Sequence, residues 1–349
     1  MTTLLRRGLV AERGAGGSSG GRPPVILGFD DDRYNAFGVE LDADTITVLR
    51  VNLRGETLDV RRAPFAVAED PDGALAYVSA MVCDMILASG HLLERILGLG
   101  VAVPCPIDPV TASAPANLFL PRWQGVPVAA ALGAATGLTV LVENTATVGA
   151  LAEQWWGAGV GGEDLVYIAA AGCVGAGFVF RGDVYRGVNG AAGEIAHLQV
   201  DDDGAPCACG LRGCLVTRVG ARALTGRAAS LDAAEPFPNL ASIVTRAIEG
   251  APAARRVVAE AGSALGRCVA TIVNLTNPTL VVVGGPLPTT GALFMDPLRA
   301  AVRERTHIAA VAKTPVMASA LGPTSVALGA ATLVIARGLE RTLLDAAFS

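Results

Sequence analysis

The stretch GVNGAAGEIAHLQVDDDGAPCACGLRGCL, residues Gly187–Leu215, is the part of the sequence that decides the fold. It contains four potential metal ligands: His197, Cys207, Cys209 and Cys214. Three thiolates and one imidazole supply the four donors of a closed, tetrahedral zinc site. Glycines allow the backbone to turn tightly around an ion, and three lie among the ligands: Gly204, Gly210 and Gly213. The spacing predicts one structural zinc ion.

The other cysteines do not form a cluster. They are scattered through apolar stretches and are expected to be small buried residues: Cys83, Cys105, Cys173 and Cys268. In a cytosolic chain, clustered cysteines indicate metal binding more strongly than they indicate a disulfide. The alternative is three reduced core cysteines beside an unrelated histidine. A closed site leaves no position for a reactive water, so the cluster is not expected to be a hydrolytic centre.

Composition limits the function classes. A chain of 349 residues is expected to fold as two or more lobes. A net charge of −5 argues against a general nucleic-acid coat, although Met1–Pro24 carries a local excess of arginine. The apolar content of 52% raises a membrane interpretation, but much of it is alanine, and Gly, Pro and Thr break the long uncharged runs. Without a signal-like start, the chain is expected to be soluble and cytoplasmic, with no membrane partner.

The order of elements predicts two α/β lobes. Strand patterns begin at Val25 with VILGFD and continue through FGVELDA and TITVLRVNL, and a helix is expected over Gly73–Leu97. Asn144 or Thr145 is expected to cap a helix that ends near Gly157. A second set of strands and helices follows. Two β-sheets flanked by helices are the economical architecture, and the crevice between them is the default ligand site.

The metal-ligand stretch closely resembles the ROK family, whose name joins repressors and sugar kinases. The resemblance extends through PANL at Pro115–Leu118, VEN at Val142–Asn144, ALAEQWWGAG from Ala150 and NPTLVVVGG from Asn277. It covers nearly everything from Val25 onward. It implies a two-lobed, actin-like and ribonuclease-H-like sugar kinase fold.

The resemblance also implies a division of the chain. Residues 1–24 are expected to be a winged-helix remnant and linker. Residues 25–140 form the amino-terminal lobe, completed by the helix at 325–349, and residues 141–324 form the carboxy-terminal lobe with the zinc site.

Four side chains match family positions that hydrogen-bond sugar hydroxyls: Asn117, Asn144, Glu194 and His197. By resemblance, His197 is both a zinc ligand and a wall of the sugar pocket. Simpler roles stay open: Glu194 as a surface carboxylate and Asn144 as a helix cap. One family contact is missing, because the glutamate that follows Cys-Leu in the family is Val216 here.

The phosphoryl-transfer residues of the family's kinases are replaced. The carboxylate that acts as general base is Thr145, and threonine cannot remove a proton in this way at neutral pH. The glycine-rich Asp-x-Gly-Gly-Thr turn is expected to correspond to Asp30–Tyr34, DDDRY, whose carboxylates would repel a triphosphate. The second turn, Gly-Thr-Gly in the kinases, is Ala171–Cys173. No catalytic residue is therefore predicted, and ATP is not expected as a cofactor.

The amino-terminal residues Leu4–Pro23 resemble the tail of the winged-helix domain that precedes the sugar lobes in ROK repressors. LLRRGLV would end the recognition-helix region, and GGSSGGRP would leave the wing. Four arginines are candidates for DNA backbone contacts: Arg6, Arg7, Arg13 and Arg22. A base-reading helix would lie before Met1. The alternative is a Gly/Ser-rich tail without structure.

The leading hypothesis is a ROK-type transcriptional regulator without catalytic activity, in which a sugar or sugar derivative binds the cleft and alters binding to operator DNA. The alternatives are a ROK-type sugar kinase that uses an unrecognised base, and a sugar-binding pseudokinase that no longer contacts DNA. A homo-oligomer, dimer or tetramer, is expected because palindromic operators require paired subunits.

Overall fold

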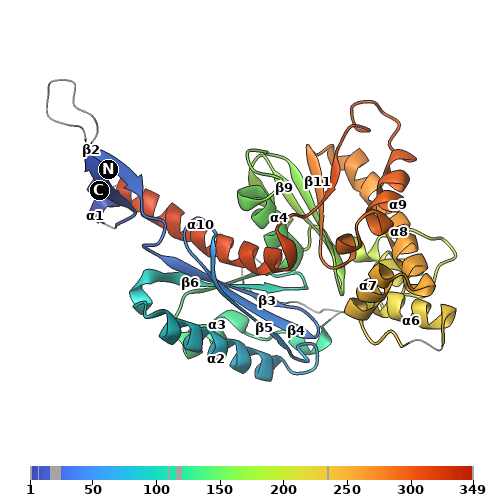
Figure 1. The fold of residues 1–349 in the computed structure, drawn as a ribbon, viewed down its shortest axis with the longest axis horizontal. Coiled ribbons are helices and arrows are strands. Elements are labelled where there is room, and N and C mark those ends of the chain that lie inside the picture. Colours follow the sequence, from blue (N-terminus) through green and yellow to red (C-terminus); the bar gives the residue numbers. More distant parts are fainter. Residues whose placement is uncertain are drawn as a thin grey trace.

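The computed structural model describes residues 2–6, 8–15, 25–108, 111–114, 120–233 and 236–347. Within these ranges the chain forms two five-stranded sheets, each covered by helices on both faces, and one small two-stranded ribbon (Figure 1). The two-lobed α/β architecture predicted from the sequence is confirmed.

The first sheet has the strand order β5-β4-β3-β6-β7. Strands β3 (Asn35–Leu41), β4 (Thr45–Val51) and β5 (Thr57–Pro64) form an antiparallel meander, and β6 (Ile96–Val103) and β7 (Val140–Asn144) continue the sheet in parallel. Strands β3, β4 and β6 are buried along nearly their whole length, as expected for strands covered on both faces.

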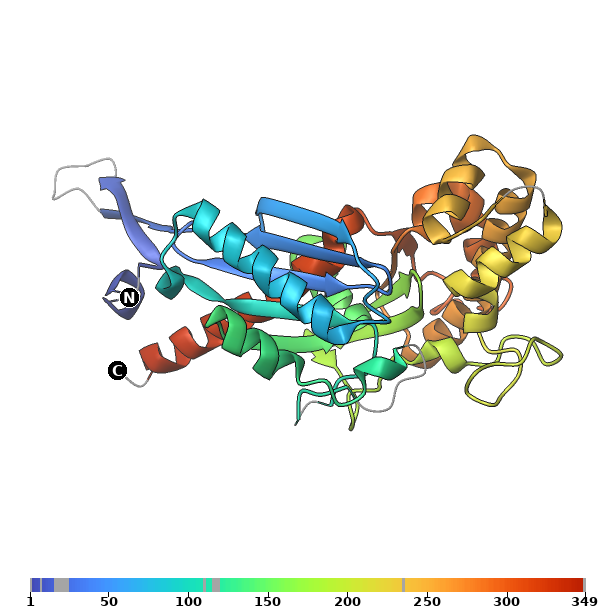
Figure 2. The same ribbon diagram turned by 90° about the horizontal axis from the view of Figure 1, so that it is seen from below.

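Helices α2 (Pro71–Ser89) and α3 (Val128–Thr136) cover one face of this sheet, as seen from below in Figure 2. Asp70 caps α2 by accepting a hydrogen bond from the amide of Gly73. The expected helix over Gly73–Leu97 is too long: α2 ends at Ser89 and is capped by Gly90, which has a left-handed φ of 66°. The chain then passes through the short helix η1 (Leu93–Arg95) into β6.

Strand β7 leads directly into helix α4 (Thr145–Trp156). The side-chain Oδ1 of Asn144 accepts hydrogen bonds from the amides of Ala146 (2.8 Å) and Thr147 (3.3 Å). The predicted cap and helix are confirmed, with the helix C-cap at Gly157. Because α4 packs on the second sheet, this junction carries the chain from one lobe to the other.

The second sheet has the strand order β10-β9-β8-β11-β12. Its strands are β8 (Leu165–Ala170), β9 (Val174–Phe180), β10 (Asp183–Tyr185), β11 (Leu280–Gly284) and β12 (Val316–Ala318). Helix α4 covers one face, and α8 (Pro252–Thr276) and α9 (Ala292–Arg303) cover the other. Three further helices pack against α8 and one another: α5 (Val216–Val219), α6 (Ala221–Leu231) and α7 (Leu240–Glu249). The remaining short helices are η2 (Pro121–Trp123), η3 (Ile195–His197), η4 (Leu287–Thr290) and η5 (Gly322–Thr324).

Helix α10 (Ser325–Ala347) closes the back of the first sheet and also crosses α4 (Figure 1). Glycines permit backbone-to-backbone contact along it. A Cβ atom at Gly38 or Gly100 would lie 1.9 or 1.8 Å from a carbonyl oxygen of α10, and one at Gly329 would lie 1.9 Å from the carbonyl oxygen of Val148 in α4. The two lobes therefore meet at an α4–α10 crossing that has no room for a side chain at position 329.

Two stretches, Pro71–Ser89 and Gly322–Glu340, are long and apolar enough to cross a membrane by length and composition. Both pack against the first sheet, which is the ordinary position of a core helix in a globular protein.

The amino-terminal piece consists of α1 (Thr2–Arg6) and an antiparallel ribbon of β1 (Val10–Ala15) and β2 (Val25–Phe29). The expectation that Val25 begins the first lobe is wrong, because β2 pairs with β1 and not with the lobe's sheet. Residues 16–24 thus connect the two strands instead of leaving the ribbon, and they lie outside the described residues. Leu9 is buried in a cluster with Leu4 and Leu339 of α10, which anchors the ribbon.

Candidate functional site

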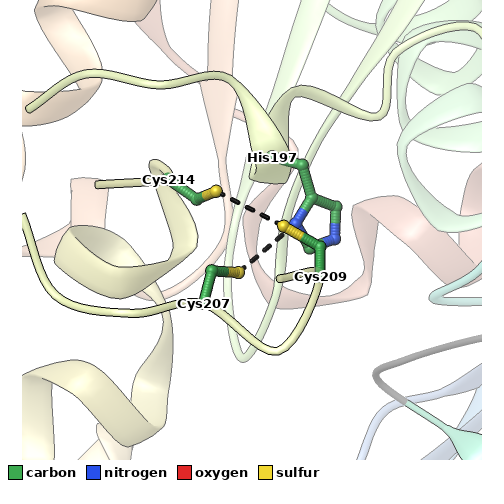
Figure 3. Close-up of side chains that lie close together, drawn as sticks. All are labelled: His197, Cys207, Cys209 and Cys214. Carbon is green, nitrogen blue, oxygen red and sulfur yellow. Dashed lines mark hydrogen bonds between the residues drawn. The ribbon is translucent and has the colours of Figure 1, made fainter. Parts of the chain in front are cut away.

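The four predicted metal ligands lie together on one loop of the second lobe (Figure 3). His197 ends the short helix η3, and the three cysteines follow on the loop before α5. The ligand atoms all lie within 4.8 Å of one another. Sγ of Cys207 is 3.5 Å from Nδ1 of His197, and Sγ of Cys209 is 3.6 Å from Sγ of Cys214.

These distances match the requirements of tetrahedral zinc. Zinc–sulfur bonds of about 2.3 Å place two tetrahedral sulfur ligands about 3.8 Å apart. The 3.6 Å separation of Cys209 and Cys214 is close to that value. His197, Cys207, Cys209 and Cys214 would hold the ion and leave no open position, so a bound zinc would brace the loop and supply no reactive water.

The loop is already shaped around this cluster. The amide of Cys207 donates to the carbonyl of Leu211 (2.8 Å), and Gly210 and Gly213 adopt left-handed φ values of 91° and 66°. A Cβ atom at Gly213 would lie 1.6 Å from the carbonyl oxygen of Asp201, so only glycine fits there. The predicted role of Gly210 and Gly213 as turn residues is confirmed.

The thiols of the cluster differ in acidity. Burial raises the pKa of Cys214 to about 12, whereas a hydrogen bond from the backbone at Leu211 lowers the pKa of Cys209. A buried thiolate at Cys214 therefore needs a nearby cation, and a metal ion supplies that charge.

A pocket opens between the two sheets and is lined by residues of both lobes. The end of β3 contributes Glu40 and Asp42, and the β7–α4 junction contributes Asn144 and Thr145. The turn between β8 and β9 and the residue before η3, Glu194, complete the wall. The predicted interlobe crevice is thus present, with Asn144 and Glu194 both in its lining.

Asn144 has two roles in this arrangement. Its side-chain oxygen caps α4, and its Nδ2 donates to the carbonyl of Cys105 at 3.0 Å, which leaves one N–H for a ligand. The adjacent Thr145 lines the same pocket, and its hydroxyl oxygen is buried without a hydrogen-bond partner. An unpaired buried hydroxyl is costly, so Thr145 has an unmet hydrogen-bonding requirement at the wall of the pocket.

Glu194 lies at the mouth of the pocket, where its residue remains exposed. The neighbouring walls remove part of its solvent, which raises the pKa of this carboxyl above its ordinary value. Burial raises the pKa of the Cys173 thiol to about 12, and the Glu194 charge adds to the effect. Cys173 was expected to be a core residue, but it lines this pocket. His197 is turned toward Cys207 in the metal cluster, and Asn117 lies outside the described residues.

The proposed equivalence between Asp30–Tyr34 and the first phosphate turn is wrong. This segment precedes β3, and Asp31 and Asp32 bond to Arg54 and Asn52 at the opposite end of the sheet from the pocket. The turn that follows the first strand of the lobe is Asp42–Asp44.

Two backbone amides of the Asp42–Asp44 turn already have hydrogen-bond partners. The amide of Asp42 donates to the carbonyl of Thr45 (3.0 Å), and the amide of Ala43 donates to the Asp42 side chain (2.8 Å). Both donors are occupied, and two carboxylates surround them. In the second turn, the amide of Ala171 donates to the carbonyl of Cys173. The sequence analysis therefore assigned the first phosphate turn to the wrong segment, and the absence of ATP binding stays a prediction.

Sequence reasoning missed Glu40 and Asp42 as pocket residues. Burial, reinforced by the Asp42 charge, raises the pKa of Glu40 to about 8, and burial also raises the pKa of Asp42. The signal was available, because both follow the buried run FGVEL at the carboxyl end of a strand, where ligands bind in α/β sheets.

The four arginine candidates for DNA contact are only partly described. Arg6 and Arg13 are exposed, and Nη2 of Arg13 donates to the carbonyl of Phe29 across the ribbon. Arg7 and Arg22 lie outside the described residues.

Comparison with known proteins gives consistent results. The ROK family model matches residues 36–337. The xylose repressor of Caldicellulosiruptor bescii is 30% identical over 345 residues, which cover 95% of this chain and 86% of that protein.

Two solved structures are also similar. A crystal structure of a ROK family transcriptional regulator, a homologue of the E. coli MLC protein, has a TM-score of 0.80 at 25% identity and covers 98% of this chain and 88% of its own. A ROK family glucokinase from Streptomyces griseus, in complex with glucose and AMPPNP, has a TM-score of 0.74 at 25% identity and covers 86% of this chain and 98% of its own. With the metal-ligand loop, the interlobe pocket and the match over most of its length, the chain belongs to the ROK family.

Proposed function

We propose that this protein is a sugar-responsive transcriptional regulator of the ROK family, acting in the cytoplasm as a homo-oligomer. The observation that carries the proposal is the amino-terminal piece. The match to the transcriptional regulator covers 98% of the chain and therefore includes the ribbon of β1 and β2. The match to the glucokinase covers only 86% of the chain. The similarity to the xylose repressor supports the same function.

In this proposal the ribbon is the wing of a winged-helix DNA-binding unit. Arg6 at the end of α1 and Arg13 on β1 are both exposed and are suited to contacts with DNA phosphates, which give affinity without sequence preference. Leu9, packed with Leu339, links the ribbon to α10 and hence to the lobes. A ligand that favours one arrangement of the lobes then shifts the population of the DNA-binding arrangement.

The interlobe pocket is the effector site in this proposal. Glu194 and the free N–H of Asn144 provide an acceptor and a donor for sugar hydroxyls, and the unpaired hydroxyl of Thr145 provides another contact. A structural zinc ion on His197 and the three cysteines holds the loop that begins three residues after Glu194.

The first prediction for this function concerns Glu194→Gln. The variant should keep its affinity for DNA from its own promoter. The sugar concentration needed to alter that affinity should rise at least about tenfold, because an amide cannot replace a charged acceptor. Gel-shift titrations with a panel of pentoses and hexoses measure both quantities.

Glu163→Gln is the matched control, since it removes the same charge at an exposed site that is not part of the pocket lining. The proposed function is contradicted if the protein does not bind its promoter in a gel shift, or if no sugar alters that binding. Sugar binding without a gel shift would favour the pseudokinase alternative.

A second prediction concerns ATP. Calorimetric titration with ATP and magnesium should give no binding at millimolar concentration, because the Asp42–Asp44 turn has occupied amides and two carboxylates. Thr145→Asp should not produce kinase activity, since the missing base would be restored without a phosphate site. ATP-dependent phosphorylation of any hexose by the unaltered protein would instead establish the kinase alternative.

A further inference from the structure

One ion pair crosses from the first lobe to the second. Glu143 is the next-to-last residue of β7 in the first sheet, and Arg186 directly follows β10 at the edge of the second sheet. Nε of Arg186 lies 2.6 Å from Oε2 of Glu143. The Glu143 side chain is 8% exposed, whereas that of Arg186 is 36% exposed. The carboxylate is therefore the buried partner, and the guanidinium is the group that neutralises it.

Glu143 is also bonded to Asn144, a residue of the pocket wall. Its Oε1 accepts a hydrogen bond from the backbone amide of Asn144 (2.9 Å), so both carboxylate oxygens have partners. The side chain of Asn144 is held at the same time, because its oxygen caps α4 and its Nδ2 donates to the carbonyl of Cys105. The Glu143 carboxylate thus belongs to the set of contacts that fixes Asn144 in the pocket wall.

Arg186 is connected to Glu194, the pocket residue on the second lobe, by a short closed loop. The carbonyl of Arg186 accepts a hydrogen bond from the amide of Ala192 (3.1 Å), which closes the start of the loop. At its end, the carbonyl of Gly193 accepts from the amide of Ala176 on β9 (2.8 Å). A Cβ atom at Gly193 would lie 1.8 Å from the carbonyl oxygen of Ala176, so the loop's backbone lies directly against the sheet. Arg186 is therefore at the base of the loop that carries Glu194.

Loss of Arg186 would leave the buried carboxylate of Glu143 without a cation. An unpaired carboxylate is unfavourable away from water, so it would move toward solvent or draw water in. Glu143 cannot move without disturbing its bond to the amide of Asn144. The loop before Glu194 would lose its attachment to the first lobe at the same time.

We propose that Glu143 and Arg186 form a positioning pair for the effector site. Neither residue is part of the pocket lining. The pair joins the lobes and fixes Glu194 relative to Asn144, so the affinity for a sugar depends on two residues outside the lining. This inference rests on the proposed effector site and adds the residues that set its geometry.

The test separates positioning from stability. Arg186→Met removes the charge but keeps a long side chain, and Arg186→Lys keeps the charge. Glu143→Gln removes the buried charge and retains an acceptor for the amide of Asn144. Arg181→Met is the matched control, because Arg181 is exposed on the turn before β10 and does not line the pocket. D-glucose and D-xylose, a neutral hexose and a neutral pentose, are titrated calorimetrically into each variant well below its thermal midpoint.

Arg186→Met should weaken the binding of either sugar that the unaltered protein binds by at least about tenfold. Arg186→Lys should stay within about threefold, because the contact uses one nitrogen and needs chiefly the charge. Adding Glu143→Gln to Arg186→Met should restore part of the affinity, since no buried charge is then left unpaired. Hydrogen exchange in the peptide covering residues 187–195 should become faster in Arg186→Met and not in Arg186→Lys. Arg181→Met should change neither quantity.

Unchanged sugar affinity in Arg186→Met, whatever its thermal midpoint, would reduce the pair to a stabilising contact and overturn the inference. Equal losses in Arg186→Met and Arg186→Lys, or failure of both sugars to bind the unaltered protein, would also overturn it. If Arg186→Met does not fold, Glu143→Gln decides: its weaker, uncharged bond to Arg186 should cost about threefold in affinity, and no loss contradicts the inference.

Failure of the inference and failure of the proposed function give different results. Sugar affinity that depends on the pair, together with promoter binding that no sugar alters, supports the inference and contradicts the regulatory role. Sugar-dependent release of promoter DNA that is the same in Arg186→Met and in the unaltered protein does the reverse.

Discussion

Replacing Cys209 with serine is expected to release the metal and to lower the midpoint of thermal unfolding by at least about 5 °C. Serine is a poor zinc ligand, so the variant would keep only three good ligands. Without the metal ion, the buried thiolate of Cys214 would also lose the cation that stabilises it. The loop also carries the pocket wall, because Glu194 precedes η3 by one residue. Metal content by plasma mass spectrometry and unfolding by calorimetry measure the two effects.

Cys83→Ser is the control for this experiment. Cys83 lies on α2, is also partly exposed, and is not part of the metal-ligand group. It should leave the metal content at one zinc ion per chain. An unaltered protein that contains no metal after purification and zinc supplementation, or a Cys209→Ser variant that keeps its metal and its thermal midpoint, would contradict the zinc assignment.

Replacing Gly329 with valine is expected to destabilise the protein by about 3 kcal/mol or more, because the lobes cannot stay packed around the new side chain. Its Cβ atom would lie 1.9 Å from the carbonyl oxygen of Val148. Backbone atoms cannot rotate away as a side chain can, so α10 must shift relative to α4. Denaturant unfolding measures the loss in free energy of unfolding.

Gly226→Ala is the matched control, since Gly226 also lies within a helix but has no atom within 4 Å of a Cβ position. Alanine there should stabilise the protein by about 0.5–1 kcal/mol because it restricts the unfolded chain. If Gly329→Val unfolds at the same denaturant concentration as the unaltered protein, the close α4–α10 crossing is wrong.

Much of this arrangement could be predicted from local sequence patterns. The Asn144 cap and helix α4 follow from one side chain and the neighbouring small residues. The metal cluster follows from ligand types that have few other reasons to occur together on a glycine-rich loop. These features depend on contacts between residues close together in the chain, which a sequence shows directly.

Features that depend on strand pairing were harder to predict. Val25–Phe29 is an apolar strand whichever partner it takes, and its own residues do not show that it pairs with β1. The same ambiguity led to the wrong assignment of the first phosphate turn, because DDDRY also follows an apolar strand. Helix α9 was not predicted, since Pro297 interrupts its pattern. Glu40 and Asp42 were not linked to the pocket because Glu194, which lines the same pocket, lies more than a hundred residues further along the chain.

Helix α10 has a mechanical consequence for the whole molecule. The whole helix extends about 35 Å at 1.5 Å per residue, and about 27 Å of that length lies beyond the α4 crossing at Gly329. A tilt of about 10° at the crossing would displace the far end of that segment by about 5 Å. Helix α10 also packs along the first sheet, so the ribbon beside Leu9 would move with the first lobe. A change of about 10° in the angle between the lobes would therefore move the ribbon relative to the second lobe by about the length of one helical turn.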